Sequence, residues 1–253
     1  MLTNKFSSDI KISFSAAKYD LISRFARTKL GPFWHTLALL LTILAMGAIY
    51  GSIVSNDTVA FTSELALSLA VWQSFSTHVI ESTSIHRETK NFYSVLGFRP
   101  FLGLLRLSMR NYFYFLFSTI SIAITYLILG LDFSISMLSI FIIYPLIVLF
   151  SFPLFYLLSI WSIKYPDISM IVNSIITLLF FISPIVWTPE MLPLDKFYFI
   201  EFNPIYYIME LSRSTFFGKE ILIQTNTYLV VFYILITLVL VFSKKDKNLF
   251  FEL

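Results

Sequence analysis

Six apolar stretches, each long enough to cross a bilayer as a helix, follow one another along this chain of 253 residues. A membrane-spanning helix needs about 20 apolar residues, because the hydrocarbon core is about 30 Å thick and each helical residue adds about 1.5 Å. The stretches cover residues 33–54, 60–80, 107–129, 133–161, 168–187 and 224–242. Their short connections leave no room for an aqueous domain. We therefore expect residues 1–253 to form one all-α polytopic membrane domain with six transmembrane helices.

The composition agrees with a membrane location and removes several kinds of chemistry. Apolar residues make up 57% of the chain and charged residues 13%, whereas soluble domains are roughly a quarter charged. The absence of cysteine excludes disulfides, thiolate nucleophiles and cysteine-ligated metals. No G-x-x-x-x-G-K-[ST] phosphate-binding loop occurs either. We therefore expect no catalytic residue, metal site or cofactor in this chain, and no nucleic acid among its partners.

The distribution of Lys and Arg predicts the orientation in the membrane. Residues 1–32 carry six of them, residues 81–110 carry five, and three lie after position 242. With Lys164, fifteen basic residues fall on one side of the predicted spans and only three on the other. By the positive-inside rule, both termini are expected in the cytoplasm.

The run from Phe180 to Arg213 is too apolar for a solvated loop and too broken to cross the membrane. Four prolines interrupt it, and lipid tolerates such backbone only where protein or water satisfies the polar groups. Residues 189–220 also carry eight charges, which are too costly for a lipid-facing span. We predict short re-entrant gate helices here, on the periplasmic side between spans five and six. Asn203-Pro204 turns the chain back towards the last span.

Residues 10–30 are predicted to form an amphipathic helix in the cytoplasmic membrane interface. At helical spacing, one face carries Phe14, Ala17, Leu21, Ile22 and Phe25, and the other carries Ser13, Asp20, Ser23, Arg24 and Arg27. Two interpretations stay open. The helix is either a plain anchor on anionic membrane lipid, which we favour, or its basic residues recognise a phosphorylated lipid headgroup. In the second case the headgroup contacts are Arg24, Arg27 and Lys29.

Two groups of residues resemble one family of membrane proteins over nearly the whole chain. The first group comprises Tyr19-Asp20-Leu21-Ile22, Arg24-Phe25 and Leu30-Gly31-Pro32-Phe33-Trp34. The second comprises Lys164-Tyr165-Pro166-Asp167-Ile168, Ser183-Pro184-Ile185, Pro193, Asn203-Pro204 and Arg213. In this order they resemble the permease subunits of ABC exporters for bacterial surface polysaccharides, a family of type-2 ABC transporters.

The resemblance implies a function and a set of partners. A second copy of the chain and two copies of a nucleotide-binding ATPase, which binds the ATP and Mg, would form the exporter in the bacterial inner membrane. The substrate would be an undecaprenyl-pyrophosphate-linked polysaccharide, with O-antigen, a part of lipopolysaccharide, ahead of capsule or teichoic-acid polymer. Export would run from cytoplasm to periplasm through a homodimeric channel.

The stretch from Glu81 to Arg99 is the best candidate for docking the ATPase, because it mixes charges with surface aromatics as interfaces do. The candidate contacts are His86, Arg87, Glu88, Lys90, Phe92 and Tyr93, with Lys164 and Asp167 as a second, smaller contact. The alternatives are a solvated loop whose aromatics rest on the headgroups, and for Asp167 a helix N-cap.

Aromatic residues suggest a path for sugars, which slide along ring faces without a deep pocket. The resemblance implies that the first and fifth spans line the pore. The candidate channel and gate residues are therefore Tyr50, Phe180, Phe181, Ser183, Pro184, Trp187, Asn203 and Pro204. The alternative for each aromatic is a packing or interface-belt role.

Two other function classes remain open at this stage. An ion-coupled secondary transporter would carry ionisable residues within several spans, and the middles of spans three to six have none. A polytopic lipid-modifying enzyme would need a cluster of His and acidic residues at one membrane face. Only His78, Glu81 and His86 come close to that pattern, and we interpret them as incidental.

Overall fold

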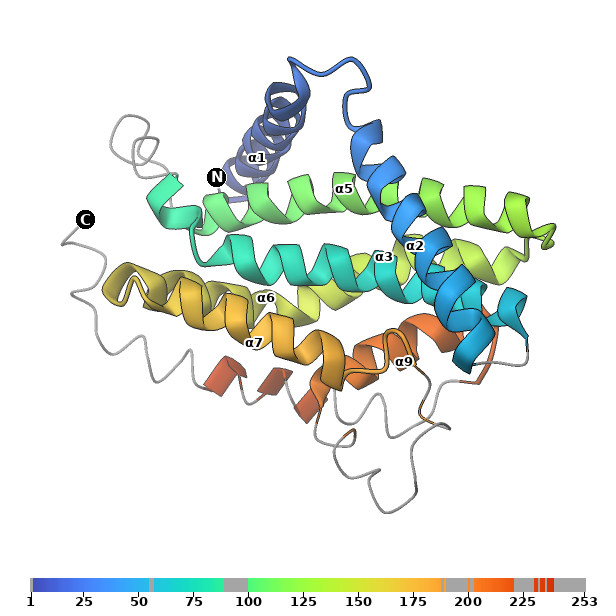
Figure 1. Ribbon diagram of the computed structural model, residues 1–253. Helices are drawn as coiled ribbons and strands as arrows, with labels where there is room; N and C mark the ends of the chain where they lie inside the picture. Colours follow the sequence, from blue (N-terminus) through green and yellow to red (C-terminus); the bar gives the residue numbers. More distant parts are fainter. Residues whose placement is uncertain are drawn as a thin grey trace.

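The computed structural model describes residues 2–54, 57–88, 100–187 and 203–220, together with 189, 200 and isolated positions between 230 and 238. In that part of the chain every regular element is a helix. In chain order these are α1 (Leu2–Phe25), α2 (Phe33–Val54), α3 (Thr58–Ser82), α5 (Pro100–Leu129), the 3₁₀ helix η1 (Ile135–Ser139), α6 (Ile140–Lys164), α7 (Ile168–Ile182) and α9 (Pro204–Phe216). Figure 1 shows α3 and α5–α7 running side by side, with α2 crossing them and α1 outside.

Helix α3 is the centre of the bundle. It contacts α2, α5, α6, α7 and α9, and 17 of its 25 residues are buried. It is rich in small and hydroxyl side chains, several of which donate to carbonyls of the helix itself. Ser68 Oγ donates to the carbonyl of Glu64 at 2.8 Å, and Thr62 Oγ1 donates to that of Thr58 at 2.7 Å. Such a helix suits the membrane because its neighbours separate it from lipid.

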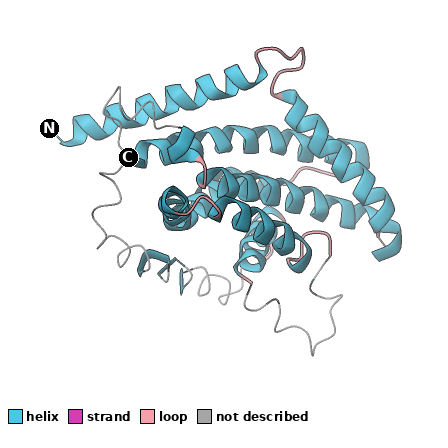
Figure 2. Cartoon of the chain, turned by 60° about the vertical axis from the view of Figure 1, so that its left-hand side comes forward, coloured by secondary structure: helices cyan, strands magenta, loops and turns pink. Residues whose placement is uncertain are grey.

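The length of α3 defines two ends of the molecule. Glu64 lies near α9 and Glu81 near α1, and the two are about 25 Å apart along a helix axis. We call these the α9 end and the α1 end. Figure 2 shows α1 running along the outside of the bundle.

Two glycines let α2 lie close against α3. A Cβ atom at Gly47 would lie 2.6 Å from the side chain of Thr62, and one at Gly51 would lie 2.7 Å from Cγ2 of Thr58. The two glycines and the two threonines are each four residues apart, so they face one another on adjacent helical turns. This is small-residue packing of the kind that joins helices in membranes.

Three of the described helices are long and apolar enough to span a membrane: Phe33–Ile53, Phe101–Leu129 and Ile135–Lys164. They coincide with the first, third and fourth predicted spans. Helix α3, the second, has the required length but is more polar. The structure therefore supports a multi-pass membrane protein, and the number six stays a prediction.

Several boundaries differ from the predicted ones. The fifth stretch, 168–187, is helical only to Ile182, because Ser183 adopts an extended conformation before Pro184. Helix α1 begins at Leu2 and ends at Phe25, whereas residues 10–30 were expected. Helix α5 begins at Pro100, before the expected 107. Of 224–242, only isolated positions are described, and these are helical.

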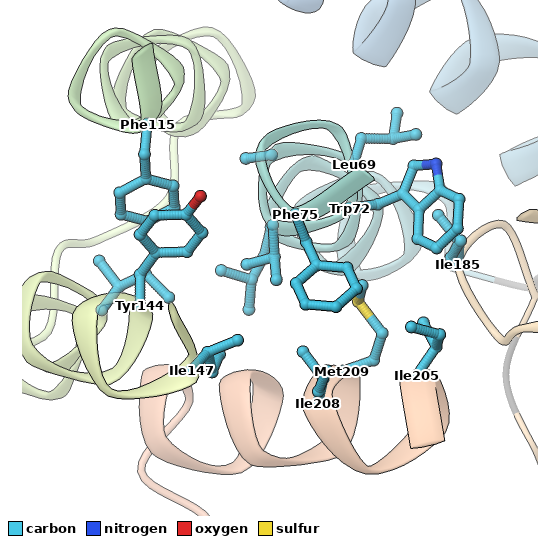
Figure 3. Close-up of a cluster of buried hydrophobic side chains, with 14 of the residues drawn as sticks. Leu69, Trp72, Phe75, Phe115, Tyr144, Ile147, Ile185, Ile205, Ile208 and Met209 are labelled. Carbon is cyan, nitrogen blue, oxygen red and sulfur yellow. The ribbon is translucent and has the colours of Figure 1, made fainter. Parts of the chain in front are cut away.

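The core connects α3 with the helices around it. The rings of Phe115 on α5 and Tyr144 on α6 stack at 3.9 Å with an interplanar angle of 7°. Figure 3 shows this pair beside Phe75 of α3, which faces Ile208 and Met209 of α9. These buried contacts hold α9 against the bundle from the side opposite α5.

Candidate functional site

A network of charged residues fixes α1 to the bundle at the α1 end. Asp20 of α1 pairs with Arg106 of α5 through both carboxylate oxygens, and Nε of Arg106 lies 2.6 Å from Oδ2. Nη1 of Arg110 is 3.6 Å from the same carboxylate, and its Nη2 donates to Glu81 of α3 at 2.9 Å. These four side chains are at most 20% exposed, so water screens their attraction only in part.

This network corrects the predicted division of α1 into two faces. Asp20 was expected on the solvated face, but it is partly buried between two arginines. Ala17 is also buried against the bundle, whereas Phe14 and Ile22 of the predicted apolar face are 49% and 57% exposed. Phe14 nevertheless contacts Phe113 of α5, and Phe25 contacts Tyr114 of α5. Helix α1 therefore packs part of its predicted apolar face against the bundle and leaves Ile22 on the outer side, where an interfacial helix contacts lipid.

The candidate headgroup residues lie at the junction of α1 and α2. Arg24 is 59% exposed, and its Nη1 lies 3.5 Å from Oε1 of Glu81 and 3.4 Å from the hydroxyl of Tyr114. Arg27 and Lys29 are exposed in the connection after α1. Two exposed guanidiniums and one exposed ammonium group thus lie at this end of the bundle.

Beside Arg24 lies a partly open cavity of about 320 Å³ lined by residues of α1, α2, α3 and α5. Polar side chains from all four helices line it, including Arg24, His35, Gln73, Asn111 and Tyr114. Sequence reasoning missed this cavity. Its residues come from four separate segments and form no local motif.

The predicted gate residues come together at the α9 end. Asn203 Nδ2 donates to Ser183 Oγ at 2.9 Å, and Asn203 Oδ1 accepts from the backbone N–H of Ile205, so this asparagine caps α9. Pro204 occupies the first position of α9, where its missing N–H costs nothing. The break after α7 is therefore tied directly to the start of α9.

Arg213 of α9 adds a second connection. It is buried, its Nη2 donates to the carbonyl of Pro184 at 2.7 Å, and both Nε and Nη2 lie within 3.1 Å of Ser68 Oγ on α3. From the sequence, Arg213 was expected as one of the outward charges and as part of the family resemblance, with no buried partner. Nothing in its local sequence distinguishes an arginine that turns inward.

The aromatic candidates are arranged unequally. Phe181 is 71% exposed and Tyr50 is 42% exposed, so both are accessible in the single chain. Phe180 is partly buried, and its ring lies 5.9 Å from that of Trp72. Trp187 is also partly buried and donates from Nε1 to the carbonyl of Phe181 at 3.2 Å. The packing alternative thus describes Phe180 and Trp187 better than it does Phe181.

Exposed polar residues mark one side of α7. Asn173, Ser174 and Thr177 are exposed there together with Phe181, and Val172 and Ile176 pack inward. The remaining exposed side is wholly apolar, with Ile171, Ile175, Leu178 and Ile182. Helix α7 therefore presents two different surfaces beyond the bundle. We call the polar one, with Asn173, Ser174 and Thr177, the α7 polar stripe.

The predicted docking loop is described only as far as residue 88, so Lys90, Phe92 and Tyr93 lie outside the described residues. Arg87 and Glu88 are exposed, as docking requires. His86 is not: its side chain is buried, and Nε2 lies 3.1 Å from Ser159 Oγ of α6. Burial lowers the pKa of His86 to about 4, so the imidazole is neutral at pH 7. His86 thus secures the loop from inside.

Lys164 and Asp167, the second predicted contact, are both exposed at the α6–α7 connection. The side chain of Asp167 makes no capping hydrogen bond to α7. Asp167 thus occupies the N-cap position of α7, as the alternative predicted, but without the side-chain hydrogen bond of a capping residue.

The histidines that suggested a lipid-modifying enzyme face different partners. His78 stacks on Phe155 at 3.9 Å and lies 3.2 Å from Ser108 Oγ, whereas His86 contacts Ser159. Within the described ranges, no group of three His, Asp or Glu side chains is arranged to hold a metal ion.

Together the helices define a multi-pass helical membrane protein with a charged, hollow α1 end and a broken helix pair at the α9 end. Comparison with known families agrees with this class. The model of the family described as ABC-2 type transporter matches residues 14–217, from α1 to the end of α9. The chain belongs to the ABC-2 type transporter family and is a membrane component of a transporter. No curated protein matches its sequence.

Proposed function

We propose that this chain is the permease half of an ATP-driven exporter that moves a lipid-linked polysaccharide through a channel between two copies of the chain. Family membership supplies the transport role and implies an ABC ATPase as partner. The α1 end faces the cytoplasm in this proposal, because most basic residues of the chain lie on that side.

The α7 polar stripe is the observation that best supports a channel. An asparagine and two hydroxyls exposed at membrane depth would be costly against lipid, even though each bonds to a carbonyl of its own helix. A water-filled pathway or a second copy removes this cost. The neighbouring apolar side of α7 is suited to lipid, so one helix separates the bilayer from the pathway.

The substrate class rests on the two ends of the molecule. Arg24, Arg27 and Lys29 supply cations for a pyrophosphate at the cytoplasmic interface, and Phe181 beside the polar stripe offers a ring face to a passing sugar. The substrate we propose is an undecaprenyl-pyrophosphate-linked glycan, O-antigen first. Residues Ser183 to Pro204 would close its exit in the periplasm.

The ATPase would dock on the loop that begins at Glu81. Arg87 and Glu88 present charges to the aqueous side, while His86 fixes the loop to α6. The exposed Lys164 and Asp167 offer a second contact. A loop held rigidly at its base can transmit the motion of a partner to α3.

Reconstitution tests the proposal. The chain is purified with the ATPase encoded beside it, incorporated into proteoliposomes, and supplied with lipid-linked glycan of the host. We expect glycan to reach the opposite leaflet only with both proteins and with ATP. A complex whose ATPase lacks its catalytic Walker lysine is the control. Movement of a solute down an ion gradient by the chain alone would favour a secondary transporter and overturn the proposal.

A further inference from the structure

The cavity between α1, α2, α3 and α5 contains a buried polar side chain with nothing to bond to. Asn111 lines this cavity, is 1% exposed, and among the residues that the structure describes has no hydrogen-bond partner for either Nδ2 or Oδ1. A buried amide without partners opposes folding, and a leucine of similar size would not. An asparagine at this position is therefore suited to hydrogen-bonding a ligand in the cavity.

The other lining groups indicate the chemistry of the guest. Gln73 and Ser74 add an amide and a hydroxyl, which with Asn111 suit a ligand that carries several hydroxyl groups. Trp34 and Tyr114 add aromatic rings, which pack against the C–H faces of a sugar. Arg24 stands at the mouth with 59% of its side chain exposed, and a guanidinium binds phosphate oxygens bidentately.

The size and position of the cavity restrict the class of ligand further. At about 320 Å³ the cavity is at the small end of ligand sites and fits one sugar ring better than an oligosaccharide. Its mouth adjoins the end of α1, where Ile22 is 57% exposed, and the start of α2, where Phe33 is 55% exposed. A guest here can keep a lipid tail in the bilayer while its sugar is inside the protein.

We propose that this cavity binds a sugar phosphate, with the phosphate on Arg24 and the sugar on Asn111, and that the source is the first sugar of the lipid-linked glycan. This rests on the proposed function for the source and on the cavity alone for the chemistry. Asn111 would select lipids that carry a sugar, whereas Arg24 would bind any lipid phosphate.

Equilibrium binding to the permease–ATPase complex in nanodiscs tests this assignment. The probes are a short isoprenyl pyrophosphate bearing one radiolabelled N-acetylhexosamine, the same lipid without sugar, and soluble N-acetylhexosamine 1-phosphate. We expect Asn111→Leu to weaken binding of the sugar-bearing lipid at least tenfold and to leave the affinity for the sugar-free lipid unchanged. Arg24→Gln should weaken both lipids. Thr125→Val, which alters a buried polar residue elsewhere on α5, is the matched control.

Stability separates a binding role from a structural one. Because Asn111 has no partner, Asn111→Leu should leave the thermal unfolding temperature of the complex unchanged or raise it. Asn111→Asp keeps the size but replaces the amide donor with a carboxylate, and should also weaken binding of the sugar-bearing lipid. Equal affinity of the wild type and both variants for that lipid would overturn the proposal.

Three further outcomes test the source of the ligand, the sugar assignment and the proposed function separately. If soluble sugar phosphate displaced the radiolabelled lipid as strongly as unlabelled lipid does, the lipid-linked glycan would be ruled out as the source of the ligand. An equal effect of Asn111→Leu on the sugar-free lipid would overturn the sugar assignment. Sugar-dependent binding in a complex that exports no glycan would refute the proposed function while supporting the cavity assignment.

Discussion

The two ends of the molecule hold buried arginines in different ways. At the α1 end, Arg106 and Arg110 are matched by the carboxylates of Asp20 and Glu81. At the α9 end, Arg213 donates to the hydroxyl of Ser68 and to a backbone carbonyl, and these acceptors are neutral. The first arrangement connects α1, α3 and α5 by charge. The second connects α3, α7 and α9 by hydrogen bonds.

The difference shows which end can rearrange at lower cost. Separating matched charges in a partly buried site leaves each one uncompensated. We therefore expect the contact of α1 with α3 and α5 to stay closed. The carbonyl of Pro184 is available to Arg213 because α7 stops at Ile182 and the backbone turns away from the helix. The position of α9 is therefore coupled to the break in α7, as a gate at the exit requires.

The largest effect is expected when the charge network is broken. Asp20→Asn leaves Arg106 and Arg110 with less negative charge in a site where both are less than 20% exposed. We expect a loss of about 3–5 kcal/mol of stability, measured by thermal unfolding in detergent micelles. Asp20→Asn combined with Arg106→Gln should recover part of this loss. A purely additive double variant would show that the pair is not coupled.

At the α9 end we expect a smaller effect. Arg213→Met removes the three hydrogen bonds to Ser68 and Pro184, whose acceptors are neutral, at a cost of about 2–3 kcal/mol. Limited proteolysis should then cut α9 faster, because its connection to Pro184 is lost. Arg213→Lys keeps the charge without the planar fork and should be intermediate. A loss equal to that of Asp20→Asn would remove the contrast between the two ends.

The contact between α2 and α3 provides a reference for packing without charge. Gly47→Val would place side-chain atoms on Thr62, and overpacking of this kind costs about 1–3 kcal/mol. The combination with Thr62→Ala should restore part of the stability, measured in the same unfolding assay. No destabilisation in Gly47→Val would contradict the close approach of the two helices.

The last prediction concerns the pH dependence of stability at the α1 end. The pKa of His86 is lowered to about 4 in the folded chain, whereas the unfolded chain takes up this proton near 6.5. The contribution of the neutral imidazole to the free energy of unfolding is therefore complete above about pH 6.5 and is lost as the pH falls towards 4. The difference in unfolding temperature between wild type and His86→Asn should shrink over that interval. A difference independent of pH would contradict a buried, neutral His86.

Sequence reasoning predicted the elements whose signal is local. Apolar length predicted α2, α5 and α6. The prolines predicted a break in the segment after α7 but not its position, because the fifth span was expected to continue to residue 187, and Asn203-Pro204 was expected as a turn and not as the start of α9. The partners of Asp20 and Arg213 were not predictable, because each lies on a helix far away in sequence. The spacing of Arg106 and Arg110, one turn apart on one helix face, was a usable signal for a shared acidic partner.

The central claim is that the transport pathway runs along the α7 polar stripe. Because the chain has no cysteine, Asn173→Cys introduces a unique thiol, and Ile175→Cys places one on the apolar side of the same helix. In membranes that contain the permease–ATPase complex, a water-soluble maleimide should label position 173 and leave position 175 unlabelled. Equal labelling of the two positions, or labelling of 175 alone, would contradict a pathway along this stripe.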